Sequence, residues 1–222
     1  MTAGLSDGGR WSDRLHLADD FWVIVHNADS GRPRLNETRR SLGLAGALLG
    51  ELVLSGHLVI HDRNVYITDV TPPVDATSHL ILEQIVAESQ AHHVQVWVKF
   101  LADSAAATMT DRLMRAGLVE REQQRRRLRQ TTVVYRPVDP NRAYWRPVLL
   151  RQALAGRYGP TGWPDMFLAG LVEATGLLPA VLQEDHAAGR SYLAHWLPRA
   201  DPPSLNELVV AVRALVGHRE EA

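Results

Sequence analysis

The chain has 222 residues, of which 45% are hydrophobic and 22% are charged, and its formal net charge is −1. These proportions are typical of folded soluble domains and exclude a disordered or fibrous chain. Because cysteine is absent, thiol nucleophiles, disulfides and cysteine-ligated metals are excluded as well. The first twenty residues hold no apolar run of signal-peptide length, and the most apolar segment, 42–54, is too short to cross a bilayer.

The first part of the chain predicts a flexible tail followed by two helices. Residues 1–11 are rich in Gly, Ser and Asp, which is typical of a loose terminus. Ser12 can cap a first, mostly apolar helix, and a second helix can begin at Asn36 or Thr38. Gly56 supplies a signal for the end of the second helix. Small residues on this helix would allow another element to pack closely, and they are Gly43, Gly46, Ala47 and Gly50.

The middle of the chain predicts two β-hairpins separated by helices. Residues 57–69 hold two short β-prone runs around a polar turn. The stretch 76–90 has helical spacing, 94–101 is either an apolar helix or a strand, and 108–116 is a helix. Residues 118–136 then repeat the order of helix, glycine and hairpin.

The last third of the chain is predicted to be helical. Glycine and proline separate its helical patterns, which are 141–155, 163–175, 179–188, 192–197 and 204–216. The sequence therefore predicts a mainly α fold with two small β-hairpins. Residues 12–218 are expected to form its single domain.

Patterns for catalysis and metal binding are weak. His79 and Glu83 have the spacing of one helix face, but two ligands do not define a metal site. His57 and His61 fall in a predicted strand and turn, where a spacing of four does not bring both rings together. No serine lies in a G-x-S-x-G arrangement, and no phosphate-binding glycine loop occurs. We therefore expect a non-enzymatic protein without a metal or cofactor.

The strongest local feature is a run of arginines in the second predicted hairpin. Residues 112–151 contain eleven arginines against three acidic residues, although the whole chain is nearly neutral. In an extended strand, alternate residues share a face at a spacing of about 6–7 Å, so Arg125, Arg127 and Arg129 would form a row of guanidinium groups that suits phosphates, with Arg126 on the other face. The candidate anion-binding residues of this hairpin are Arg121, Arg125, Arg126, Arg127 and Arg129.

Three interpretations of the arginine run remain open. Anionic membranes and nucleic acids would both be attracted to it, and charge alone does not separate them. The order of helix, glycine and hairpin is similar to a winged helix, which makes a nucleic-acid-binding protein the alternative function. The preceding helix offers only Arg112 and Arg115 and lacks the side chains expected for reading bases. A solvated hairpin, partly neutralised by acidic residues elsewhere, is the third interpretation.

Five segments carry a family resemblance. They are LHLADDFWVIVHNADSGRPRL at 15–35, LAGALLGELVLSGHLVI at 44–60, DRLMRAGLVERE at 111–122, YRPVDP at 135–140 and DMFLAGLVEATGLLPAVL at 165–182. With the connecting order they span about 15–216 and resemble the Golgi phosphoprotein 3 family, most closely its bacterial, actinobacterial-like members. The ELVLSGHL and MRAGLV stretches, each followed by a hairpin, are the more specific parts.

This resemblance implies a mostly helical single domain with a projecting second hairpin, in a cytoplasmic protein peripherally associated with membranes. Eukaryotic members bind phosphatidylinositol 4-phosphate and act as adaptors for glycosyltransferases without catalysis of their own. The family's hairpin, which corresponds to 118–136 here, takes part in membrane contact and in oligomer formation. The implied partners are anionic phospholipid, a membrane-linked enzyme and a second copy of this chain.

The head-group pocket of the eukaryotic members uses one tryptophan and three arginines. By ungapped matching these fall at Asn36, Ala45, Asp103 and Ala106, so this chain keeps none of the four. Arg39 and Arg40 lie near the first position, close to a predicted helix N-terminus where anions are favoured, or are ordinary solvated residues of the first turn. We expect an adaptor or scaffold that binds anionic, phosphoinositide-like head groups.

Overall fold

The computed structural model describes most of the chain. The described ranges are 16–88, 90, 92–125, 131–154, 162–182 and 185–218, with the backbone alone at 125, 131 and 142–144. The predicted tail at 1–11 and the predicted cap Ser12 lie outside these ranges. Within them, the first helix begins at Leu17, with His16 in the capping position.

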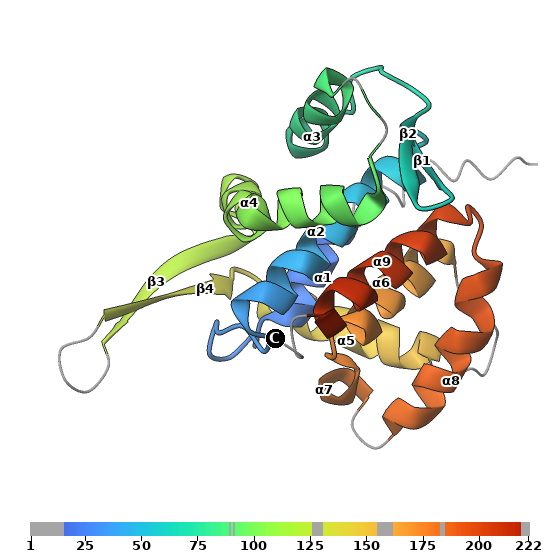
Figure 1. The fold of residues 1–222 in the computed structure, drawn as a ribbon. Helices are drawn as coiled ribbons and strands as arrows, with labels where there is room; N and C mark the ends of the chain where they lie inside the picture. The colour runs from blue at the N-terminus through green and yellow to red at the C-terminus, as the bar shows by residue number, and fades with distance from the viewer. Residues whose placement is uncertain are drawn as a thin grey trace, which may run out of the picture.

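The described residues form nine α-helices and two antiparallel two-stranded hairpins, which confirms the mainly α prediction (Figure 1). The helices are α1 Leu17–Val25, α2 Glu37–Leu54, α3 Ala76–Ala87, α4 Val94–Arg115, α5 Pro140–Leu154, α6 Trp163–Ala174, α7 Leu178–Leu182, α8 His186–Trp196 and α9 Ser204–His218, with a short 3-10 turn at Leu197–Arg199. The strands are β1 Leu58–His61, β2 Asn64–Ile67, β3 Val119–Arg125 and β4 Thr131–Pro137.

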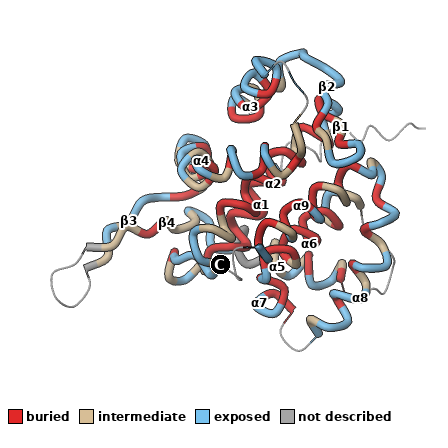
Figure 2. The backbone as a smooth tube through the Cα atoms, viewed as in Figure 1, coloured by how far each residue is buried: buried red, intermediate tan, exposed pale blue. Residues whose placement is uncertain are grey.

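Helix α2 runs through the centre of the molecule, where α1, α4, α6 and α9 surround it (Figure 2). Asn36 is its N-cap, because the side-chain oxygen accepts the backbone N–H of Arg39. Gly56, with φ +80°, follows its last turn as predicted. A Cβ built on Gly43 would lie 2.3 Å from the Phe21 ring, which confirms the predicted close packing.

The first hairpin turns through Asp62 and Arg63, which both have positive φ, as a two-residue hairpin turn requires. The hydroxyl of Ser204 fixes it to the start of α9, donating to the carbonyl oxygen of Ile60 and accepting its N–H. The hairpin is therefore part of the helical body. By contrast, β3 and β4 project away from that body (Figure 1).

Two predicted helix boundaries were wrong. Residues 94–101 and 108–116 belong to one helix, α4, because the alanine-rich link 102–107 contains neither glycine nor proline and continues the buried helical stripe. The predicted helices at 179–188 and 192–197 were also misplaced, since α7 ends at Leu182 and α8 covers 186–196. A Cβ on Gly189 would lie 2.3 Å from the Leu182 side chain, so the two helices pack against each other instead of forming one rod.

Candidate anion-binding surface

The pairing of β3 with β4 divides the second hairpin into two chemically different faces. The strands are antiparallel, from Val119 opposite Pro137 to Arg125 opposite Thr131, and side chains alternate between faces along each strand. By this register one face, here called the basic face, holds Val119, Arg121, Gln123, Arg125, Thr131, Val133, Tyr135 and Pro137. The other, here called the mixed face, holds Glu120, Glu122, Gln124, Thr132, Val134 and Arg136.

The two faces differ in how their charges are paired. On the mixed face, Arg136 Nε lies 2.6 Å from Glu122 Oε2, so this guanidinium is neutralised. On the basic face, Arg121 is exposed and has no ion-pair partner among the residues that the structure describes, and Tyr135 beside it is half-buried. The basic face therefore offers free positive charge next to an aromatic ring with a polar tip.

The structure places only part of the predicted arginine row. Arg125 occupies the last position of β3 by its backbone, and Arg126, Arg127 and Arg129 lie outside the described residues. Of the predicted row, only the register position of Arg125 is described, and the row stays a prediction; Arg121 is a separate candidate on the same face by register.

Arg39 and Arg40 lie in the first turn of α2, where both are half-buried. The Arg39 guanidinium reaches toward the end of α6, since a Cβ on Gly176 would lie 3.1 Å from its Nη1. Arg40 Nε is buried without a hydrogen-bond partner. Both side chains thus lie against the body and are less open to solvent than Arg121.

The segment 26–36 joins the start of α2 to the base of the second hairpin. Gly31 has φ +65°, and a Cβ there would lie 2.8 Å from the carbonyl oxygen of Tyr135, so the approach requires glycine. The exposed Arg32 and Arg34 on this segment were not predicted as site residues. No local sequence signal places them near the hairpin, because the approach of Gly31 to Tyr135 is a tertiary contact.

His26, at the start of this segment, is buried in its neutral form. Its Nδ1 lies 2.7 Å from the carbonyl oxygen of Trp22 and donates to it, and its ring stacks on the Trp22 ring at 3.8 Å. The pKa of His26 is lowered to about 4, mainly by burial; the hydrogen bond to Trp22 opposes this shift, and the nearby Arg40 adds to it. The loop that contacts the hairpin is therefore anchored by a group that resists protonation.

This environment predicts a loss of stability in acid. The pKa of His26 is depressed from 6.5 to about 4, so its contribution to stability is full above pH 6.5 and is lost as the pH falls toward 4. At pH 5 the loss is about 2 kcal/mol. Between pH 7.5 and 5, the free energy of unfolding of the wild type should fall by about this amount relative to that of His26→Gln. Urea titrations of both proteins measure it, and a constant difference would contradict the assignment.

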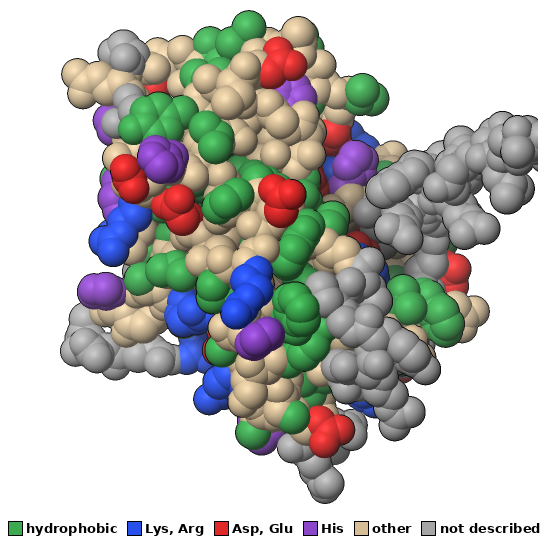
Figure 3. Space-filling view, turned by 90° about the vertical axis from the view of Figure 1, so that its right-hand side faces the viewer, with side chains coloured by type: hydrophobic (Ala, Val, Ile, Leu, Met, Phe, Trp, Pro, Cys, Tyr) green, Lys and Arg blue, Asp and Glu red, His purple; other side chains and the backbone are tan. Residues whose placement is uncertain are grey.

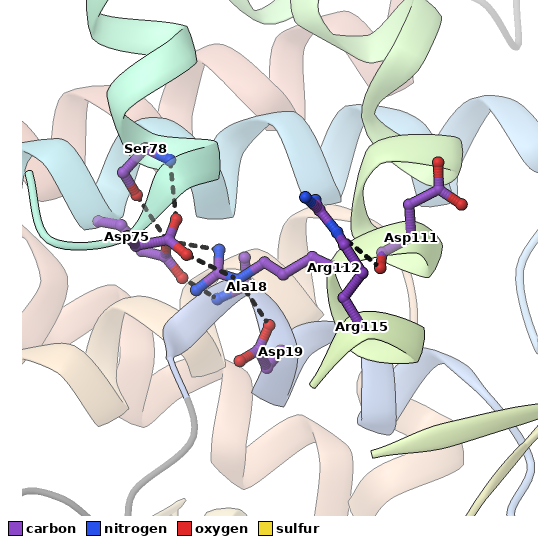
Figure 4. A network of polar contacts seen from close by, with 8 residues as sticks. Ala18, Asp19, Asp75, Ser78, Asp111, Arg112 and Arg115 are labelled. Carbon is purple, nitrogen blue, oxygen red and sulfur yellow. Dashed lines mark hydrogen bonds and ion pairs between the residues drawn. The ribbon is translucent and has the colours of Figure 1, made fainter. Parts of the chain in front are cut away.

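A buried ionic network lies where α1, α2, α3 and α4 meet (Figure 4). Arg112 of α4 has its Nη1 3.0 Å from Glu51 Oε2, and its Nε 3.3 Å from Asp19 Oδ1 and 3.5 Å from Asp75 Oδ1. Glu51 also accepts the backbone N–H of Ala18 at 2.8 Å. This network orients α1 and α3 on the central helices and leaves Arg112 unable to reach a ligand at the surface.

A second network ties α1 to α5 and α6. Arg146 Nη2 lies 2.6 Å from Asp20 Oδ2 and 2.9 Å from Asp165 Oδ1. Burial raises the pKa of Asp19 to about 6 and that of Asp20 to about 7, although the facing guanidinium groups lower both. Sequence reasoning missed both networks. The available signal was the pair of adjacent aspartates inside an otherwise apolar helix.

Ser55 and His57, at the end of α2, have the geometry of a nucleophile and a base. Ser55 Oγ lies 2.8 Å from His57 Nδ1, and His57 Nε2 lies 3.0 Å from the carbonyl oxygen of Thr71. The backbone N–H groups of Ser55, Gly56 and His57 all donate to carbonyls of the last turn of α2. These N–H groups are therefore not free to stabilise an oxyanion. The Ser55–His57 hydrogen bond instead holds together the turn between α2 and β1.

In the described part of the chain, no group of three or more His, Asp or Glu side chains is arranged so that it could hold a metal ion. His79 and Glu83 share a face of α3, as their spacing predicts, with His79 Nε2 3.2 Å from Glu83 Oε1.

Among the described helices, none is long and apolar enough to cross a membrane. On the face opposite the hairpin, acidic, basic and histidine side chains lie among apolar ones without one charge dominating (Figure 3).

These features define a mainly helical protein of one domain whose most prominent exposed element is a hairpin with one basic face. A family model for Golgi phosphoprotein 3 (GPP34) matches residues 17–215, so the chain belongs to this family. The family is known for phosphoinositide binding at membranes and is generally non-catalytic. A search of curated proteins finds no match.

The four positions of the eukaryotic head-group pocket have unlike environments in this structure. Asn36 is the N-cap of α2, and Ala45 is fully buried inside that helix. On α4, Asp103 is exposed and Ala106 is partly buried against the core. None of the four supplies positive charge, so the arginines of the second hairpin and of 32–40 are the candidates for anion contact.

Proposed function

We propose that this protein binds anionic lipid head groups at a membrane surface through the basic face of the β3–β4 hairpin, as a non-enzymatic, cytoplasmic, peripheral adaptor or scaffold. The observation that carries the proposal is the division of the hairpin. Arg121 is exposed and unpaired within the described residues, whereas Arg136 on the mixed face is neutralised by Glu122. Membership of a phosphoinositide-binding family supports the same conclusion.

The proposed contact is mainly electrostatic and reversible. Each basic residue near an anionic bilayer contributes about 1 kcal/mol, and this attraction decays over about 8 Å at physiological salt. Arg125, Arg126, Arg127 and Arg129 would add to Arg121, and the half-buried Arg39 and Arg40 in the first turn of α2 are further candidates. A membrane-linked enzyme and a second copy of the chain, through 118–136, are the proposed protein partners.

Charge reversal on the basic face tests the proposal. The variant Arg121→Glu/Arg125→Glu is expected to bind anionic vesicles at least about thirtyfold more weakly, because two contributions of about 1 kcal/mol are lost and repulsion is added. The control Arg190→Glu/Arg199→Glu changes net charge equally on exposed residues of another part of the fold. Co-sedimentation with phosphatidylcholine vesicles, without and with phosphatidylglycerol or phosphatidylinositol 4-phosphate, across a salt series, measures the effect.

Three outcomes would contradict the proposal. Equal binding by the hairpin variant and the control would remove the hairpin as the contact. Equal binding to neutral and anionic vesicles would remove the electrostatic mechanism. Displacement from vesicles by duplex DNA, with tighter binding to the DNA, would favour the nucleic-acid alternative.

A further inference from the structure

Helix α5 presents large apolar side chains to solvent on one side. Trp145 is 60% exposed and Val148, three residues later, is 38% exposed. Residues three apart lie on the same side of a helix, and the opposite side of α5 buries Leu150 and Leu154 and holds Arg146 in its ion pairs. Trp145 therefore lies on the side of α5 that faces away from the core.

This apolar side begins at the base of the second hairpin. The backbone N–H of Val138, just after β4, donates to the carbonyl oxygen of Leu118 at 3.0 Å, and α5 starts at Pro140. At 1.5 Å per residue, Trp145 lies about 7.5 Å along the helix from that start. Val138 is itself 57% exposed. The three exposed apolar side chains therefore lie within a short stretch of chain that starts at the base of the hairpin.

The size and chemistry of the patch indicate its partner. A stable protein interface buries about 800 Å² on each side, whereas three partly exposed side chains, only one of them aromatic, offer a few hundred at most. Tryptophan, by contrast, is the side chain most typical of the boundary between lipid head groups and acyl chains, where its ring is apolar and its N–H stays hydrated. A bilayer also needs no complementary shape.

We propose that Trp145, with Val148 and Val138, forms a second membrane contact that enters the head-group region of the same anionic bilayer. This inference rests on the proposed function of the hairpin. Membrane binding then has two components, an electrostatic one from the basic face and an apolar one from the outer side of α5. Two components give stable attachment where a single weak signal gives only marginal binding.

Two substitutions at Trp145 test this contact. On phosphatidylcholine–phosphatidylglycerol vesicles, Trp145→Ala is expected to lower the partition coefficient on the order of tenfold, since the apolar area that enters the bilayer is lost. Phe100→Ala, at a 54% exposed aromatic on α4, serves as the matched control and should bind as the wild type does. Vesicles with brominated acyl chains should quench wild-type tryptophan emission, and Trp145→Phe, which keeps an apolar ring, should lose most of that quenching.

The outcomes separate the two proposals. If Arg121→Glu/Arg125→Glu abolishes binding while Trp145→Ala binds normally and Trp145→Phe is quenched like the wild type, the hairpin contact stands and the α5 contact is wrong. If the wild type binds no anionic vesicle, both are wrong. Unchanged thermal unfolding of Trp145→Ala shows that its weaker binding does not come from a damaged fold.

Discussion

Replacing Arg112 by leucine is expected to lower the free energy of unfolding by about 3–5 kcal/mol. The guanidinium is the shared partner of Asp19, Glu51 and Asp75 in a site where its own side chain is only 7% exposed. Removing it leaves three carboxyl groups close together without their compensating charge, and their desolvation is then unbalanced. Urea titration at pH 7.5 measures the loss.

The same helix offers a matched control for this prediction. Arg115 is exposed, and within the described residues its Nε donates to the carbonyl oxygen of Asp111 one turn earlier. Arg115→Leu should therefore change the free energy of unfolding by less than about 0.5 kcal/mol. The defect of Arg112→Leu should shrink at pH 5, because protonation removes the uncompensated charge of Asp19. Equal effects of the two substitutions would show that the network contributes little.

Adding a single methyl group at Gly50 is expected to cost about 3 kcal/mol. A Cβ there would lie 2.2 Å from Cε1 of Phe167, a side chain of α6 that is completely buried. Alanine is a better helix former than glycine by about 1 kcal/mol, so a net loss of stability must come from the overlap. Thermal and urea unfolding of Gly50→Ala measure it.

Two further variants isolate the steric cause. Gly217→Ala adds the same methyl group near the end of α9, where nothing lies within 4 Å, and should leave stability unchanged or slightly raised. Gly50→Ala/Phe167→Leu should be more stable than the sum of the two single changes predicts, because the smaller side chain makes room. Additive losses would contradict the proposed overlap.

The sequence predicted most helices of this fold because their ends carry local chemical signals. Asn36 and Gly56 mark the limits of α2 through a side-chain cap and a positive φ, and both act within a few residues. The errors arose where no such signal exists. The alanine-rich link inside α4 is compatible with one helix or two, and only the continuous buried stripe from Trp97 to Leu113 decides between them.

The sequence shows which residues make up the candidate site, but it shows less of how they are arranged in space. A row of arginines and the ends of a hairpin are visible in the sequence, and the register then assigns Arg121 and Tyr135 to one face. The approach of Gly31 to Tyr135 and the exposure of Trp145 depend on how distant elements pack, which no local pattern encodes. The adjacent aspartates of α1 signal buried charge, but the networks of Arg112 and Arg146 join helices far apart in the chain, so the sequence does not identify their partners.

The separation of charge between the basic face and the mixed face of the β3–β4 hairpin affects how the molecule is oriented near a charged surface. By register, Arg121 lies on one side of the β3–β4 hairpin, and Glu120 with the neutralised Glu122–Arg136 pair lies on the other, so the described part of the hairpin has an electric dipole across its plane. A negatively charged surface exerts a torque on such a dipole before contact is made. Under the proposed function, the molecule would therefore approach an anionic membrane with a preferred tilt, and every bound copy would turn the same side of its helical body away from the surface.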